Sequence, residues 1–228
     1  MIEPRETIAA WAAGRFYPLA GEDASRTALD DLQDAMAAEP KDWWSAFVEV
    51  LRAGDQAAVG NLGSPLARLL YVAQPELHRE IAAAARIEPK VAEAFWSAME
   101  DLRAQRLAYR ELGRVLVVST YRDYCETDSW EYSWSFSALL YLLEDEPDEL
   151  WSIGLDLLRT GDDEMPRIVG AVILEELLER YLDRYVEQME AEAQRDPRFK
   201  LALGTVYLSK VPAQLVARVQ AAADKKLV

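Results

Sequence analysis

Apolar residues recur at every third or fourth position along most of the chain, which predicts amphipathic α-helices. In residues 147–160, Trp151, Leu155 and Leu158 fall on one face of such a helix, and acidic residues flank it on both sides. The same apolar spacing occurs in residues 40–53. These two stretches therefore predict two helices of one design at distant places in the chain.

The sequence repeats itself over this separation. Of the 17 positions from Glu39 to Asp55, eight are identical to the residue 107 positions further on, whereas chance gives about one. The identical pairs are Glu39/Glu146, Pro40/Pro147, Trp44/Trp151, Ser45/Ser152, Leu51/Leu158, Arg52/Arg159, Gly54/Gly161 and Asp55/Asp162. Gly63 then meets Gly170, and after a shift of one residue 65–70 meets 173–178. The pattern predicts two tandem related helical units, a first repeat at 1–107 and a second repeat at 108–228, with the option that both share one continuous core.

The repeated helix carries signals at both of its ends. Glu39-Pro40 and Glu146-Pro147 predict helix starts, because proline fits the first turn and the helix dipole favours an acidic residue there. Gly54 and Gly161 stand where a left-handed C-terminal cap is expected.

Residues 114–121, "RVLVVSTY", conflict with this pattern because their β-branched residues favour a strand. The stretch at the same position of the first repeat, "ETIAAWAAGRFY", is typical of a helix. We follow the repeat and predict a helix at 114–121. The predicted fold is therefore all-α, of the helical-repeat or bundle type, with no sheet of consequence.

A set of residues in the second repeat carries a family resemblance. These are Trp151, Leu157, Leu158, Gly170, Leu174, Glu175, Leu177, Leu178, Glu190 and Ala193, followed by the most specific run, Asp196-Pro197-Arg198-Phe199 with Ala202, Leu203 and Val206. In these positions the second repeat resembles a family of uncharacterised bacterial proteins that is known only as a domain of unknown function. The first repeat is a weaker copy, with Glu88-Pro89-Lys90-Val91 in place of the run. The resemblance implies an all-α fold and supplies neither an activity nor catalytic residues.

The charge balance bears on possible partners. The chain has 40 acidic and 25 basic residues, a net charge of −15, which disfavours binding to nucleic acid or anionic membranes and suits a cationic partner. A simpler explanation is that the acidity only keeps the protein soluble. The start of the chain has no basic and apolar signal pattern, and no apolar run approaches the ~20 residues of a membrane span, so we expect a soluble cytoplasmic protein.

Histidine and cysteine, which most catalytic and metal sites need, are scarce in this sequence. His78 is the only histidine and Cys125 the only cysteine, which excludes an internal disulfide and the usual zinc cages and catalytic triads. "GNLGS" at 60–64 lacks the lysine of a phosphate-binding loop. We predict a protein that is not an enzyme and has no cofactor or metal, although chemistry that needs only carboxylates stays open.

The acidic residues are unevenly distributed. Residues 121–164 contain thirteen acidic and two basic residues, against nine and four at the corresponding positions 11–57. This segment also contains alternating aromatic residues, and acids beside aromatics are typical of an interface with a cationic protein. We expect one exposed patch as the partner-binding site, made of Asp123, Glu126, Asp128, Trp130, Glu131, Tyr132, Glu144, Asp145, Glu146, Asp148, Glu149, Asp162, Asp163 and Glu164. Trp134 and Phe136 could belong either to this interface or to the core.

Three functions compete on this basis. The first is an immunity protein that neutralises a toxin of the same bacterium, with the acidic patch facing a basic toxin domain. The second is a helical-repeat scaffold or adaptor that binds a peptide or protein, mainly through the aromatic residues. The third is a carboxylate- or metal-dependent enzyme. The small size, the strong acidity, the absence of catalytic side chains and the helical-repeat surface together favour the first.

Overall fold

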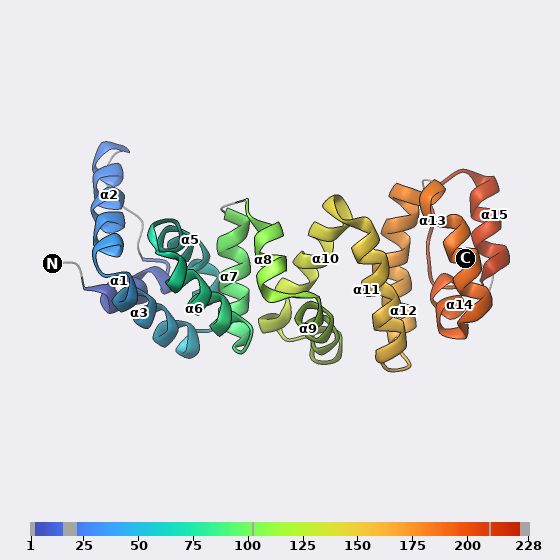
Figure 1. The fold of residues 1–228 in the computed structure, drawn as a ribbon, viewed down its shortest axis with the longest axis horizontal. Helices are drawn as coiled ribbons and strands as arrows, with labels where there is room; N and C mark the ends of the chain where they lie inside the picture. The colour runs from blue at the N-terminus through green and yellow to red at the C-terminus, as the bar shows by residue number, and fades with distance from the viewer. Residues whose placement is uncertain (1–2, 16–21, 102, 210, 224–228) are drawn as a thin grey trace. The chain divides into compact units, whose positions relative to one another are not determined.

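The protein is described by a computed structural model over residues 3–15, 22–101, 103–209 and 211–223 (Figure 1). These residues form helices and loops and contain no strand, which confirms the predicted all-α class. Contacts group the chain into an N-terminal unit, Met1–Phe136, and a C-terminal unit, Ser137–Val228. This division follows spatial contacts, whereas the boundary at 107/108 follows sequence similarity, so the two repeats stay a prediction.

The N-terminal unit contains the helices up to the start of α10. They are α1 (Pro4–Ala12), α2 (Glu22–Ala38), α3 (Pro40–Ala53), α4 (Gln56–Asn61), α5 (Gly63–Val72), α6 (Pro75–Ala85), α7 (Pro89–Asp101), α8 (Gln105–Leu112), α9 (Arg114–Thr127) and the 3₁₀ turn η1 (Trp130–Tyr132). Helix α7 is central, because α3, α4, α5, α6, α8 and η1 all pack against it. The largest fully buried side chains of the N-terminal unit include Trp43 and Phe47 of α3 and Trp96 of α7.

Helix α9 contains the stretch with strand propensity, so the helix predicted at 114–121 is confirmed. Val117, Thr120 and Tyr121 are buried on one of its faces, and this packing outweighs the preference of the β-branched residues. At the start of α10 (Trp134–Asp145), Trp134 is buried, and its ring lies 6.1 Å from that of Trp96. Trp134 is therefore a core residue.

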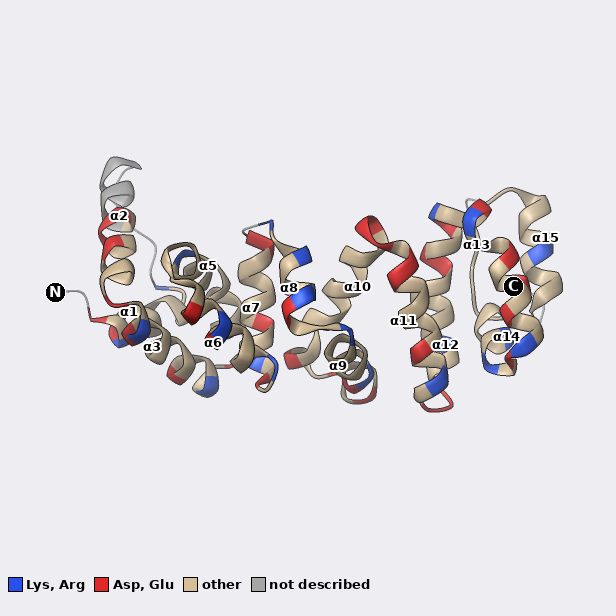
Figure 2. Ribbon diagram, viewed as in Figure 1, with Lys and Arg blue, Asp and Glu red and all other residues tan. Residues whose placement is uncertain are grey.

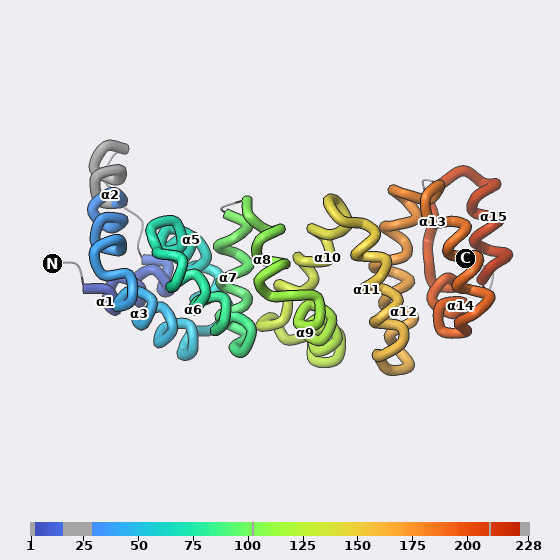
Figure 3. Tube along the Cα trace, viewed as in Figure 1, coloured from blue at the N-terminus to red at the C-terminus, as the bar shows by residue number. Residues whose placement is uncertain are grey.

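The C-terminal unit is built around a long helix. It contains the rest of α10, then α11 (Pro147–Thr160), α12 (Met165–Val169), the π-helical turn η2 (Gly170–Leu174), α13 (Glu175–Arg195), α14 (Pro197–Leu203) and α15 (Ala213–Ala222). Trp151 of α11 stacks on Tyr185 of α13, with 5.4 Å between ring centroids, and meets the ring of Phe199 of α14 edge-on. These aromatic contacts join the three helices. Figure 3 shows the path of the backbone through these helices.

The helix ends correct one prediction. Pro40 and Pro147 begin α3 and α11 as expected. Gly54 and Gly161, however, are extended, with φ of −73° and −80°, so the predicted left-handed caps are wrong. A Cβ atom at Gly161 would lie 2.5 Å from Met165 Cγ and 2.8 Å from the Leu157 carbonyl oxygen. Glycine is needed there because the next helix approaches closely, and not because the backbone turns.

Several local arrangements occur twice at the offset of the repeat. Lys90 Nζ donates to the Gly54 carbonyl at 2.7 Å, and Arg198 Nη2 donates to the Gly161 carbonyl at 2.9 Å. A Cβ atom on Gly63 would overlap the hydroxyl of Ser97, and one on Gly170 would overlap the hydroxyl of Thr205. The break between α5 and α6 at Ala73 has its counterpart in the kink of α13 at Tyr181.

No helix among the described residues has both the length and the apolar character that a membrane crossing requires.

Candidate functional site

The predicted partner-binding residues fall into three groups. Asp123, Glu126, Asp128, Trp130, Glu131 and Tyr132 lie along the end of α9 and η1 in the N-terminal unit; Glu144, Asp145, Glu146, Asp148 and Glu149 lie at the α10–α11 turn; Asp162, Asp163 and Glu164 lie at the α11–α12 turn. The second and third groups are at opposite ends of α11, as the red segments in Figure 2 show. A helix of 14 residues separates its ends by about 20 Å. The expectation of one patch is therefore wrong for these two groups.

The third group has a structural role. The carboxylate of Asp162 accepts hydrogen bonds from the backbone N–H groups of Glu164 and Met165, both at 3.1 Å, before α12 begins. Asp55 does the same before α4, where it accepts from Ala58 N at 2.9 Å. The identity of these two aspartates in the repeat is explained by helix capping. Glu164, directly before α12, pairs with Arg167 of that helix at 3.1 Å.

In the first group, Lys90 of α7 engages two of the predicted residues. Its ammonium lies 3.8 Å from a Glu131 carboxylate oxygen and 5.9 Å from the centre of the Trp130 ring. Asp128 has a left-handed backbone, with φ of 50°, and ends α9. Three of the six residues therefore help to hold η1 and the end of α9 in place.

Glu93 of α7, which was not predicted, fixes the start of α10. Its carboxylate accepts from Trp134 N at 2.9 Å and from Ser133 Oγ at 3.0 Å. Burial raises the pKa of Glu93, and the charge of Glu100 acts in the same direction, while the two hydrogen bonds oppose the shift. The cap therefore comes from another helix, which no local sequence signal reveals.

The second group is attached to α13 by two arginines. Arg180 forms ion pairs with Glu144 and with Glu176, and Arg184 pairs with Asp148. The Tyr185 hydroxyl also donates to Asp148 at 2.7 Å. Burial and this hydrogen bond raise the pKa of Tyr185, so the tyrosine stays a donor. These contacts bring the α10–α11 turn and the middle of α13 side by side.

The two segments together form an acidic surface in the C-terminal unit. We define it as Glu144, Asp145, Glu146, Asp148, Glu149, Glu176, Asp183 and Glu187 with Arg180 and Arg184, so that its net charge is −6. Asp145, Asp183 and Glu187 are exposed. Sequence reasoning missed the three acids of α13 because they alternate there with basic and apolar residues. Their exposed face on one helix is the signal that could have revealed them.

Among the residues that the structure describes, no group of three or more His, Cys, Asp or Glu side chains could hold a metal ion.

Comparison with known proteins gives a match for the part of the chain that carries this surface. Residues 123–227 match a family of unknown function, DUF6869. No curated protein and no solved structure matches the chain. The DUF6869 segment covers less than half of the chain and includes every residue of the acidic surface, as well as Arg198 and the kink of α13. The corresponding positions of the first repeat lie outside it.

Proposed function

We propose that the chain is a non-catalytic binding protein and that the acidic surface of its C-terminal unit docks a basic protein partner. The observation that carries this proposal is the position of Glu144 and Asp145 at the C-terminal end of α10. Negative charge at that end of a helix opposes the helix dipole and costs about 0.3–1 kcal/mol for an exposed group such as Asp145, whereas Glu144 pairs with Arg180. The corresponding residues of the first repeat are Ala37 and Ala38. Asp145 stands at this position beside the other acids of the surface, which supports a role in binding.

The arrangement of the surface suits electrostatic steering. Arg180 and Arg184 pair with three of its eight carboxylates, those of Glu144, Glu176 and Asp148, and they fix the turn against α13. A pre-organised surface of one sign raises the rate of association with an oppositely charged partner and makes the affinity depend on salt. A basic protein partner follows from this sign.

A narrower version of the proposal is an immunity protein that neutralises a basic toxin domain of the same bacterium. Its support is the acidity of the chain and the scarcity of the usual catalytic side chains, with one histidine and one cysteine. A basic toxin gene next to the gene of this chain, together with direct binding of its product, would distinguish it from a general adaptor. An adaptor that uses aromatic residues would instead lose binding in Trp130→Ala and keep it after charge reversal.

The test is capture of proteins from an extract of the source cell on the immobilised chain. We expect a basic protein to be retained at low ionic strength and released by about 0.5 M NaCl, where the Debye length falls to a few ångström. The variant D145K/D183K/E187K should lose the partner. The control D30K/D31K/D34K changes the net charge equally on exposed residues of α2 and should keep it. Equal capture by both variants, or capture that salt does not weaken, would contradict the proposal.

We also infer that residues 1–107 are a second, diverged copy of the DUF6869 unit. The twice-occurring contacts of Lys90 and Arg198 with the ends of α3 and α11 support it. So does η2: a π turn closes an i→i+5 hydrogen bond and takes up one more residue than an α turn. The sequence register shifts by one residue between Gly170 and residue 173, inside η2 (Gly170–Leu174). The π turn thus accounts for the shift.

A further inference from the structure

We propose that the N-terminal unit holds a binding site for a small, uncharged, single-ring molecule of the phenol class, between α5, α6, α7 and α8. This site is separate from the acidic surface, and its test is independent of the proposed partner. It is a cavity of about 140 Å³, and its lining includes Leu70, Phe95, Met99 and Leu107. Apolar cavities of roughly 150 Å³ take up benzene-sized molecules. The volume therefore sets the size of the ligand.

The charges at the cavity explain why the ligand is uncharged. Arg79 and Glu111 also line it, but each already has a partner: Arg79 pairs with Glu76 at 3.0 Å, and Glu111 pairs with Arg86 at 2.9 Å. An ionised ligand would lose its hydration in this cavity without gaining a free counter-charge, which is costly.

His78 supplies a polar group in the cavity wall. Its Nε2 lies 2.6 Å from the carbonyl oxygen of Leu70, and because a carbonyl only accepts, Nε2 carries the proton and donates. In the neutral ring, Nδ1 is then an acceptor. Because His78 lines the cavity, a ligand hydroxyl within reach of Nδ1 would donate to it, and we expect phenol to bind better than benzene.

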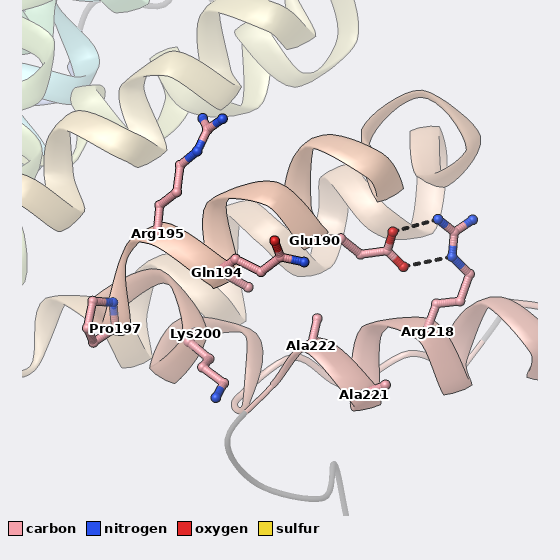
Figure 4. A pocket seen from close by; sticks show the side chains of 9 residues that line it. Glu190, Gln194, Arg195, Pro197, Lys200, Arg218, Ala221 and Ala222 are labelled. Carbon is pink, nitrogen blue, oxygen red and sulfur yellow. Dashed lines mark hydrogen bonds and ion pairs between the residues drawn. The ribbon is translucent and has the colours of Figure 1, made fainter.

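The fold itself does not require the cavity. In the second repeat, Glu190 and Pro212 stand at the positions of Ala82 and Ala104, two small residues that line it. Glu190 accepts from Arg218 of α15 in a two-pronged pair at 2.8 and 2.7 Å, and this pair lowers the pKa of Glu190 (Figure 4). The pocket that this pair lines has a volume of about 650 Å³ and is therefore larger than the cavity of the first repeat. Arg195 and Lys200 also line it, and their side chains point in different directions. The small, mainly apolar cavity therefore belongs to the first repeat.

Calorimetric titration of the full chain with phenol, benzene and benzoate tests the site. We expect phenol to bind, benzene to bind more weakly, and benzoate to bind at least about tenfold more weakly than phenol because its charge would be buried. In methyl NMR spectra, phenol should shift Leu70, Met99 and Leu107. No heat and no shift at about 10 mM phenol, far above the Kd that a well-fitted ligand of seven heavy atoms allows, would overturn the proposal.

Two variants separate binding from a general effect on folding. Ala104→Leu places bulk at the partly exposed N-terminal end of α8 and should weaken phenol binding at least tenfold without disturbing the fold. Ala83→Leu adds the same bulk on the exposed side of α6 and should leave the affinity unchanged. Phenol affinity in Ala104→Leu equal to that of the unmodified chain would show that phenol binds elsewhere, and would overturn the assignment.

Discussion

Single residues in this protein are fixed by close approaches more than by local backbone preference. Gly161 has a backbone conformation that any residue can adopt, yet a Cβ atom would collide with the first turn of α12. Gly54 is in the same arrangement but is less crowded, because the nearest atom to a Cβ there would be Ala58 Cβ at 3.0 Å. The sequence locates both glycines correctly at helix ends, but it cannot distinguish a crowded extended glycine from a left-handed one.

Substitution of Gly161 tests this explanation. Gly161→Ala should lower the free energy of unfolding by about 1–3 kcal/mol, since Met165 and the Leu157 carbonyl cannot both move away. Gly161→Asn should be no better, although asparagine tolerates a left-handed cap. Gly60→Ala, in α4 with open space around it, should instead stabilise by about 0.5–1 kcal/mol. Chemical denaturation measures all three free energies of unfolding. A Gly161→Asn variant as stable as the unmodified chain would contradict this explanation and support a left-handed cap.

Glu93 predicts a dependence of stability on pH. Because burial raises its pKa above the ordinary 4.5, the folded state holds this proton more tightly than the unfolded chain. The contribution of Glu93 is fully present below pH 4.5 and is lost as the pH rises through the raised pKa. Glu93→Gln keeps an acceptor for Trp134 N and does not titrate. Denaturation from pH 4.5 to 8 should show the variant gaining on the unmodified chain, and a constant difference would contradict the shift.

At the scale of elements, the sequence predicts most helices because their apolar spacing and proline starts are local signals. Residues 114–121 were predicted correctly only by comparison with the first repeat, since their propensity alone favours a strand. The candidate site was predicted in part. Its α10–α11 acids stand together in the sequence, whereas Arg180, Arg184 and the acids of α13 come close only through helix packing. A count of charges within one segment therefore cannot identify the residues of α13 that belong to the site.

Deletion of single residues tests the origin of the π turn. Removing Ala171 should convert η2 to an α turn and leave the rest of the register intact, at a cost of about 1 kcal/mol or less. Removing Ser64, at the same position of the first repeat, rotates the remainder of α5 relative to α7 and should cost about 3 kcal/mol or more. Both are measured by chemical denaturation. A cost for the Ala171 deletion as large as that for the Ser64 deletion would remove the π turn as support for the duplication.

At the scale of the whole molecule, the net charge of −15 disfavours the compact state through self-repulsion, so stability should rise with salt. Repulsion between carboxylates is strongest on the acidic surface, which includes Asp145, the last residue of α10. Asp101 is also exposed and also ends a helix, α7, in the N-terminal unit. The two aspartates therefore share the unfavourable interaction with a helix dipole, while only Asp145 lies on the acidic surface.

This pair separates stability from function. Asp145→Lys and Asp101→Lys should each raise the free energy of unfolding by about 0.5–1 kcal/mol at low salt, because a lysine at the end of a helix interacts favourably with the dipole. Only Asp145→Lys should reduce capture of the basic partner. Thermal unfolding and the capture assay, run on the same preparations, report the two effects. If both variants gain stability and both still capture the partner, then Asp145 contributes nothing to binding, and the unfavourable acids of α10 lose their functional explanation.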